Sequence, residues 1–180
     1  MTQAKALPGI PPGVSAVVGG EGVGKTTLLR HLAERAIQSG QTVYWPDPAA
    51  VVDDQMTPRA HFERLRGRYP ALDEALLAEL ADELGLTEHL DKALFMLSTG
   101  SRRKVWWVAG FASGADLMLI DQPFAALDMA SIRVLTTWLA EAAEHPHRAW
   151  VVADYEAPMG VCWRQVVDLG DTPAWRDADR

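Results

Sequence analysis

The stretch GGEGVGKT at residues 19–26 constrains this chain more than any other part of its sequence. It fits the phosphate-binding pattern G-x-x-x-x-G-K-[ST] at every fixed position. Glycines let the backbone turn tightly and point successive N–H groups at phosphate oxygens. Lys25 offers a cation to the terminal phosphates, and the hydroxyl of Thr26 is suited to Mg²⁺. We therefore expect a phosphate and metal site made of Gly19, Gly20, Glu21, Gly22, Val23, Gly24, Lys25, Thr26 and Thr27.

The segments on either side of this loop support that interpretation. Residues 14–18 form a short apolar run that predicts a buried strand, and residues 25–38 have helical periodicity. Ser39 and Gly40 would end that helix. A helix that begins at the loop points its N-terminal N–H groups at the phosphates. The alternative, a loop that is rich in glycine by chance, leaves this strand–loop–helix order unexplained.

The composition describes an ordinary globular chain. Of its 180 residues 48% are apolar and 23% are charged, so we expect one domain over residues 1–180. The net charge of −7 argues against a broad nucleic-acid surface. Cys162 is the only cysteine, which excludes an internal disulfide, and we expect it in the core. We expect no membrane span, because no run of about 18 apolar residues occurs.

The rest of the chain alternates between strand and helix patterns. Strands are expected at 42–45, 116–121, 149–153 and 164–170, and helices at 58–66, 70–84, 97–111 and 129–143. This alternation predicts an α/β fold with a mainly parallel sheet flanked by helices. A leucine-rich block at about 56–96 predicts a small helical subdomain. The five histidines do not have metal-ligand spacing, and His145 and His147 are expected in a loop.

Four further segments resemble the ATP-binding cassette (ABC) ATPases, in the order in which that family has them. Residues 97–101, LSTGS, resemble the family signature, and residues 117–121, LMLID, resemble the Walker B strand. Residues 123–128, PFAALD, resemble the D-loop, and residues 164–170 resemble the closing strand and turn. The resemblance implies a P-loop NTPase fold. It looks closest to small bacterial importer or exporter ATPase subunits, such as the haem-export type.

The resemblance assigns roles to residues outside the phosphate loop. Asp121 would hold Mg²⁺ beside Thr26, and Ser98 and the Gly100 amide would contact ATP bound to the other subunit of a head-to-tail dimer. Gln55 lies where the family has a Gln that links the nucleotide to a transmembrane permease subunit. An ordinary exposed loop residue is an equally good interpretation of Gln55.

The sequence departs from the family at the positions that carry catalysis. Gln122 replaces the glutamate that follows the Walker B aspartate, and Tyr155 replaces the switch histidine. An amide orients water but does not accept its proton at neutral pH, so we expect slow hydrolysis. Asp154 or Glu156 is an alternative base. The N-terminal β-subdomain is truncated. Tyr44 or Trp45 could provide an aromatic ring for adenine, but core packing suits both residues better.

The combined expectation is the ATP-binding subunit of an ABC-type transporter, with ATP and Mg²⁺ as ligands. It would form a homodimer or pair with another ABC ATPase, and it would lie in the cytoplasm at the inner face of the membrane with a permease partner. The alternative is a degenerate ATPase that serves as a regulatory or structural module, as Gln122 and Tyr155 suggest. A phosphoryl-transfer enzyme is disfavoured because residues 97–128 would have no role in it.

Overall fold

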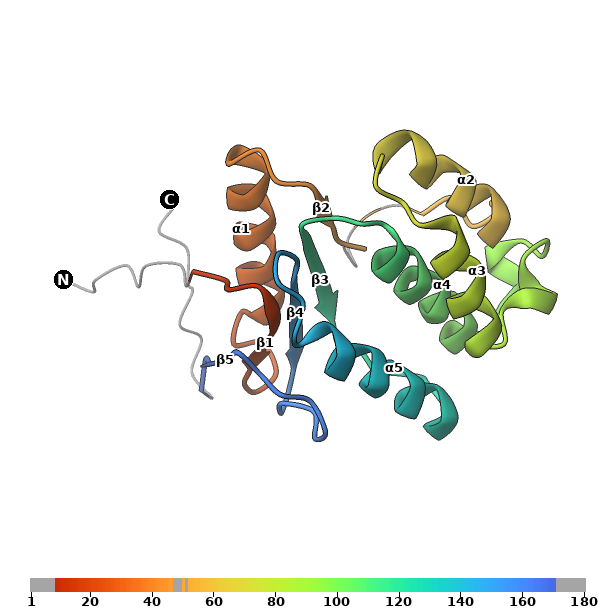
Figure 1. The fold of residues 1–180 in the computed structure, drawn as a ribbon. Helices are drawn as coiled ribbons and strands as arrows, with labels where there is room; N and C mark the ends of the chain where they lie inside the picture. The colour runs from red at the N-terminus through yellow and green to blue at the C-terminus, as the bar shows by residue number, and fades with distance from the viewer. Residues whose placement is uncertain (1–8, 47–49, 51, 171–180) are drawn as a thin grey trace. The chain divides into compact units, whose positions relative to one another are not determined.

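The chain folds into two compact units in a computed structural model that describes residues 9–46, 50 and 52–170. The first unit comprises Met1–Val43, Asp116–Pro123 and Thr136–Arg180, and the second comprises Tyr44–Ala115 and Phe124–Leu135. Most of the strands and helix α1 (Lys25–Gln38) belong to the first unit, and the helices α2 (Pro58–Arg68), α3 (Glu74–Glu83) and α4 (Thr99–Ala112) belong to the second (Figure 1). The second unit is therefore helical, while the first is built on a sheet.

The sheet has five strands in the order β2-β3-β4-β1-β5. The strands are β1 (Gly13–Val18), β2 (Val43–Tyr44), β3 (Leu117–Asp121), β4 (Ala149–Asp154) and β5 (Gln165–Asp168). The pairs β1–β4, β1–β5 and β3–β4 are all parallel. The predicted α/β fold with a mainly parallel sheet is thus confirmed. Parallel strands bring their carboxyl ends to one edge, and the chain leaves β1, β3 and β4 there.

Helix α1 (Lys25–Gln38) packs on the sheet against β3 and β4 (Figure 1). Its buried face has the helical spacing that the sequence predicted, with Leu28, Leu29 and Leu32 at its centre. Ser39 caps the C-terminus, and Gly40 follows with φ of 82°. The predicted helix over 25–38, ended by Ser39 and Gly40, is confirmed.

Three of the predicted strands are shorter in the structure. The strand expected at 42–45 is only Val43–Tyr44, and the one expected at 116–121 begins at Leu117. Just before these two strands, Thr42 donates its N–H and its hydroxyl to the carboxylate of Asp116 at 2.8 and 2.7 Å. These bonds lower the pKa of Asp116. Strand β5 covers only Gln165–Asp168 of the expected 164–170.

The second unit contains α2 (Pro58–Arg68), α3 (Glu74–Glu83), α4 (Thr99–Ala112) and two short 3-10 helices, η1 (Thr87–His89) and η2 (Leu94–Met96). Side-chain caps begin the three α-helices. Thr57 Oγ1 accepts from Ala60 N–H, Asp73 Oδ1 accepts from Leu76 N–H, and Ser98 Oγ accepts from Ser101 N–H. Helices α2 and α3, η1 and η2 all fall within residues 56–96. Helix α4 packs against α2 and α3.

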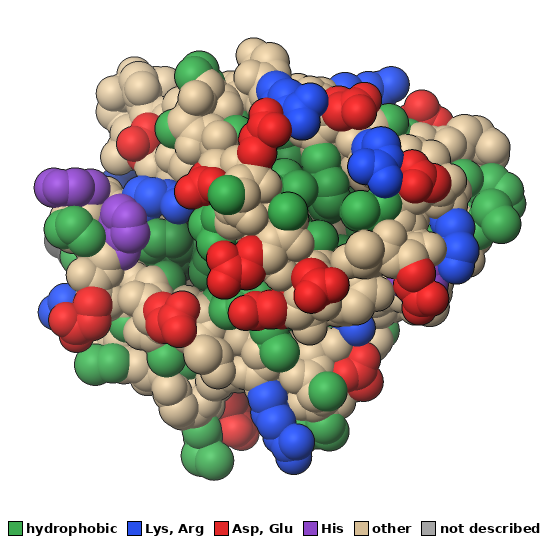
Figure 2. All heavy atoms as spheres, turned by 45° about the vertical axis from the view of Figure 1, so that its right-hand side comes forward, with side chains coloured by type: hydrophobic (Ala, Val, Ile, Leu, Met, Phe, Trp, Pro, Cys, Tyr) green, Lys and Arg blue, Asp and Glu red, His purple; other side chains and the backbone are tan. Residues whose placement is uncertain are grey.

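Helix α5 (Met129–Ala142) begins in the second unit and ends in the first, which contains residues from Thr136 onward. Leu135 and Leu139 are fully buried on it. Within the part of the chain that the structure describes, no helix combines the length and apolar character needed to span a bilayer. Figure 2 shows acidic side chains spread over the face that it presents, in keeping with the net charge of −7.

Cys162 does not lie in the core. Its thiol is free and the residue is exposed, in the segment between β4 and β5. The expectation of a core cysteine was therefore wrong. Hydrophobic character alone placed it inside, whereas the segment that carries it crosses the surface and buries few side chains.

Candidate functional site

The phosphate-binding loop connects β1 directly to α1, as the motif predicts. Gly24 takes the position before the helix, with φ of 100°, a left-handed conformation that glycine adopts without a steric cost. Among the described residues, no side chain caps this N-terminus and no acidic residue lies in its first turn. The backbone N–H groups at the start of α1 therefore keep their capacity to bind an anion.

The other loop residues divide into exposed and buried positions. Glu21 and Gly22 are exposed, and Thr27 is half-buried. Val23 is 1% exposed, so its side chain belongs to the core and only its backbone is available to a ligand. Gly19 is closely packed, since a Cβ there would lie 2.9 Å from the carbonyl oxygen of Gly170.

Lys25 is the buried cation of the site. The residue is only 7% exposed, and its Nζ donates hydrogen bonds of 2.6 Å to the carbonyl oxygens of both Gly19 and Gly20. The same Nζ lies 4.7 Å from the centroid of the Tyr155 ring. The structure thus brings together a P-loop lysine and the residue at the predicted switch position, which are far apart in sequence.

Thr26 and Asp121 form the second contact of the site. The Thr26 hydroxyl donates a hydrogen bond of 2.5 Å to Asp121 Oδ2. Both residues carry the hard oxygen atoms that Mg²⁺ prefers, and magnesium sites use one or two carboxylates together with substrate phosphates and water. Among the described residues, no three His, Cys, Asp or Glu side chains gather into a metal site of their own. The donor set at Thr26 and Asp121 therefore fits Mg²⁺ held jointly with a nucleotide.

Gln122 and Tyr155 follow the ends of neighbouring strands. Gln122 has φ of 49°, and its N–H donates to the carbonyl oxygen of Ala153 at 2.8 Å. Such a φ is uncommon outside glycine and is often found at functional sites. Tyr155 is 52% exposed, and its N–H donates to Asp154 Oδ1 at 2.8 Å. Both predicted positions thus lie at the edge of the sheet that carries the P-loop.

Ser98 and Gly100 lie in the second unit, at the start of α4. Ser98 is the N-cap, and its Oγ lies 3.0 Å from both the N–H and the Oγ of Ser101. A Cβ on Gly100 would lie 2.5 Å from the carbonyl oxygen of Ala126. The predicted signature segment therefore does begin a helix, as expected. Its glycine also packs against the residues that resemble the D-loop.

The end of the D-loop segment is fixed by Asp128. Its carboxylate accepts bonds from the N–H and the hydroxyl of Ser131 at 2.8 and 2.9 Å, and Lys104 Nζ lies 3.2 Å from its other oxygen. Hydrogen bonds from Ser131, and then from Lys104, lower the pKa of Asp128 to about 2. The D-x-x-S spacing is a helix-capping signal that the sequence analysis missed.

Gln55 lies in a tight turn of the second unit and is exposed. Its N–H bonds to Asp53 Oδ1 at 3.2 Å, and its Nε2 donates to Asp54 Oδ1 at 3.4 Å. These partners are its own chain neighbours. The turn fixes the backbone of Gln55, and a role for its amide in binding stays a prediction.

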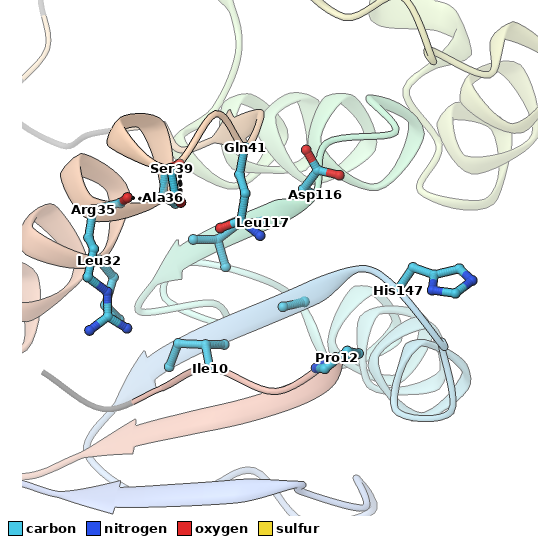
Figure 3. A pocket seen from close by; sticks show the side chains of 11 residues that line it. Ile10, Pro12, Leu32, Arg35, Ala36, Ser39, Gln41, Asp116, Leu117 and His147 are labelled. Atoms are coloured by element: carbon cyan, nitrogen blue, oxygen red, sulfur yellow. Dashed lines mark hydrogen bonds between the residues drawn. The ribbon is translucent and has the colours of Figure 1, made fainter.

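A pocket of about 210 Å³ lies away from the P-loop, at the opposite ends of the strands (Figure 3). Leu117 and Ala149, the first residues of β3 and β4, line it together with Leu32 and Arg35 of α1. Figure 3 shows the side chains of Asp116 and His147 pointing away from its centre. Its polar groups do not converge, so the P-loop edge of the sheet remains the candidate site.

Comparison with known proteins agrees with this geometry. The family model for ABC transporters matches residues 11–125. The cytochrome c biogenesis ATP-binding export protein CcmA of Salmonella typhi is 33% identical over 139 residues, which cover 69% of this chain and 67% of that protein. The protein of the same name from Pseudomonas syringae pv. syringae is 29% identical over 149 residues, covering 72% of this chain and 69% of the relative.

Solved structures show the same fold. An ABC transporter ATP-binding protein from Pyrococcus furiosus matches with a TM-score of 0.71 at 18% identity, covering 89% of this chain and 86% of that chain. The archaeal ribosome recycling factor aABCE1 matches with a TM-score of 0.67 at 24% identity. That match covers 81% of this chain and 29% of aABCE1, so this chain spans less than a third of it. Because the family model covers more than half of the sequence and the P-loop has the expected geometry, this chain belongs to the ATP-binding cassette family as an ATPase subunit.

Proposed function

We propose that this chain binds MgATP through residues 19–27 and works as the ATP-binding subunit of a transporter. The observation that carries the proposal is the start of α1, where an uncapped helix N-terminus and the buried Lys25 lie side by side. A buried cation beside free N–H groups attracts the phosphates of a nucleotide. Thr26 and Asp121 supply oxygen atoms for the metal.

The complete site would form between two subunits. Ser98 and the Gly100 amide stand at the N-terminus of α4, where they suit an anion. In a head-to-tail dimer they would close over the ATP held by the P-loop of the other subunit. The second subunit would be a copy of this chain or another ABC ATPase.

The names of the relatives support a proposal for the transport role and for the partner. The similar proteins of Salmonella and Pseudomonas are named as ATP-binding export proteins of cytochrome c biogenesis. We infer an export-type transporter with a separate transmembrane permease, and a location at the cytoplasmic face of the membrane. ATP binding would close the dimer, and its hydrolysis would open it again.

Hydrolysis would be slow because Gln122 holds the position of the general base. An amide does not accept a proton from water at neutral pH, and a general base contributes about 10²–10⁴-fold to a rate. The same residue supports a second candidate function. A chain that binds ATP and scarcely hydrolyses it would serve as a regulatory or structural module in its assembly.

ATP binding is tested by titration calorimetry on the wild type, Lys25→Ala and the matched control Lys92→Ala, which removes an exposed lysine in the second unit. We expect the wild type and Lys92→Ala to bind MgATP alike and Lys25→Ala to lose at least tenfold in affinity. Equal affinity in all three proteins, or no binding by the wild type, would contradict the proposal.

The dimer is tested at Ser98 with two variants that both keep the helix cap. Ser98→Asp places a negative charge where the phosphate of the partner would lie, and Ser98→Asn is its uncharged control. We expect analytical ultracentrifugation to show ATP-dependent self-association in the wild type and Ser98→Asn but not in Ser98→Asp. Phosphate release, measured in parallel, separates the two candidate functions, since brisk turnover that depends on Lys25 would exclude the regulatory module.

A further inference from the structure

The pairing of β1 with β4 places Tyr155 beside the P-loop. Val17 lies opposite Ala153 and Val18 lies opposite Asp154 in this parallel pair. The residues that follow, Gly19 and Tyr155, therefore leave the sheet at the same edge. The backbone bends at Tyr155, whose N–H donates to Asp154 Oδ1.

The ring of Tyr155 lies over the ammonium group of Lys25. The distance of 4.7 Å from Nζ to the ring centroid is well inside the range of cation–π attraction. An ammonium group has three N–H donors. Here the carbonyl oxygens of Gly19 and Gly20 accept two bonds of 2.6 Å, and the aromatic face adds a third attraction.

A nucleotide would compete for the same ammonium group, because the P-loop lysine reaches the β- and γ-phosphates. We propose that Tyr155 is a positioning residue that competes with the phosphates for Lys25 and so weakens the binding of ATP and ADP alike. Tyr155 is 52% exposed and is not part of the core, so its side chain can swing outward without disturbing the core. This inference rests on the proposed function, since it concerns the same nucleotide site.

Competition for Lys25 and a direct contact between the tyrosine hydroxyl and the γ-phosphate predict opposite changes in nucleotide affinity when the side chain is removed. A direct contact would make the removal of the hydroxyl weaken ATP binding and leave ADP binding unchanged. Competition for Lys25 depends on the aromatic face and not on the hydroxyl. Removing the ring would then strengthen the binding of both nucleotides.

The test measures ATP and ADP affinities by titration calorimetry for the wild type and three variants at Tyr155. Tyr155→Phe keeps the ring, Tyr155→Leu keeps apolar bulk without the ring, and Tyr155→Ala removes both. Met159→Ala, at a position that is 92% exposed in the same segment, is the matched control. Thermal unfolding of each protein confirms that it is folded.

We expect Tyr155→Ala and Tyr155→Leu to bind both nucleotides about two- to fivefold more tightly, which is the lower end of the range for a cation–π pair, because Tyr155 is half exposed although Lys25 is buried. Tyr155→Phe and Met159→Ala should bind like the wild type. Unchanged or weaker binding in Tyr155→Ala and Tyr155→Leu would overturn the inference, as would a loss confined to ATP in Tyr155→Phe. Failure of every protein to bind ATP would instead contradict the proposed function, and the inference with it.

Discussion

The hydroxyl of Thr26 and the carboxylate of Asp121 are joined by a hydrogen bond of 2.5 Å, although 95 positions separate the two residues in the sequence. The bond connects the first turn of α1 to the last residue of β3. It holds two oxygen-bearing side chains at the edge of the sheet where the P-loop also lies. The arrangement assembles the candidate metal site from motifs that the sequence presents separately.

Replacing Asp121 by Asn should uncouple ATP binding from Mg²⁺. The amide can still accept the bond from Thr26, so the local structure should persist, but the charge that supports the metal is lost. Changes to groups that support a bound metal typically reduce its affinity by about 10- to 100-fold. Calorimetry should show that the wild type binds ATP much more tightly in Mg²⁺ than in EDTA. For Asp121→Asn, the affinity for ATP should differ little between the two conditions. Asp82→Asn, on the exposed side of α3, should behave like the wild type.

Replacing Gln122 by Glu should increase hydrolysis. The carboxylate can accept the proton of the attacking water, so steady-state phosphate release should rise by about 10²–10⁴-fold. The same change combined with Lys25→Ala should abolish that gain, which ties it to the P-loop. A Gln122→Glu protein that is no faster than the wild type would mean that another group is the base, and Asp154→Asn and Glu156→Gln would then identify it.

Helix starts could be predicted from the sequence because their signals are local. A Thr, Asp or Ser just before the helix accepts a hydrogen bond from an N–H group within three residues, and a Pro at the first helical position has no N–H that needs a partner. The structure confirms the start at Pro58, whereas the helices expected over 70–84 and 97–111 begin at Glu74 and Thr99, directly after the caps Asp73 and Ser98. The P-loop is local in the same sense, since its glycines, lysine and threonine are contiguous and their geometry follows from their order.

Features that depend on strand register could not be predicted. The contact of Tyr155 with Lys25 exists because β4 pairs with β1 at one particular offset, and a shift of one residue would remove it. The bonds between Thr42 and Asp116, just before β2 and β3, likewise join distant segments. Cys162 was misplaced because a sequence pattern does not show which irregular segments stay at the surface.

Replacing Gly100 by Ala should destabilise the second unit. The new Cβ would meet the carbonyl oxygen of Ala126 at 2.5 Å, and backbone does not move as easily as a side chain. Overpacking of this kind costs about 1–3 kcal/mol. Gly67→Ala is the matched control, because nothing lies within 4 Å of a Cβ there and Gly67 is inside α2. Urea unfolding should show a lower free energy of unfolding for Gly100→Ala than for the wild type. For Gly67→Ala the free energy of unfolding should rise by up to about 1 kcal/mol. Equal stability of the two variants would disprove the close packing.

The last prediction concerns acid and His61. Burial, reinforced by the charge of Arg64, lowers the pKa of His61 from 6.5 to about 4. Its ring packs edge-on against Trp106 at 4.5 Å, and among the described residues its buried Nε2 has no hydrogen-bond partner. The unfolded chain therefore binds a proton at a higher pH than the folded chain does. Above pH 6.5, His61 is neutral in both states and does not change the free energy of unfolding. As the pH drops from 6.5 to 4, the free energy of unfolding should fall by up to about 1.4 kcal/mol per pH unit.

His61→Phe keeps an aromatic ring against Trp106 and removes both the titration and the unpaired nitrogen. Urea unfolding at pH 7 and pH 5 should show a smaller loss of stability for His61→Phe than for the wild type. His147→Gln, a change at an exposed histidine, should lose as much as the wild type. Identical losses in all three proteins would show that His61 does not carry the acid sensitivity. Protonation of the buried His61 ring would then not explain the loss of stability in acid.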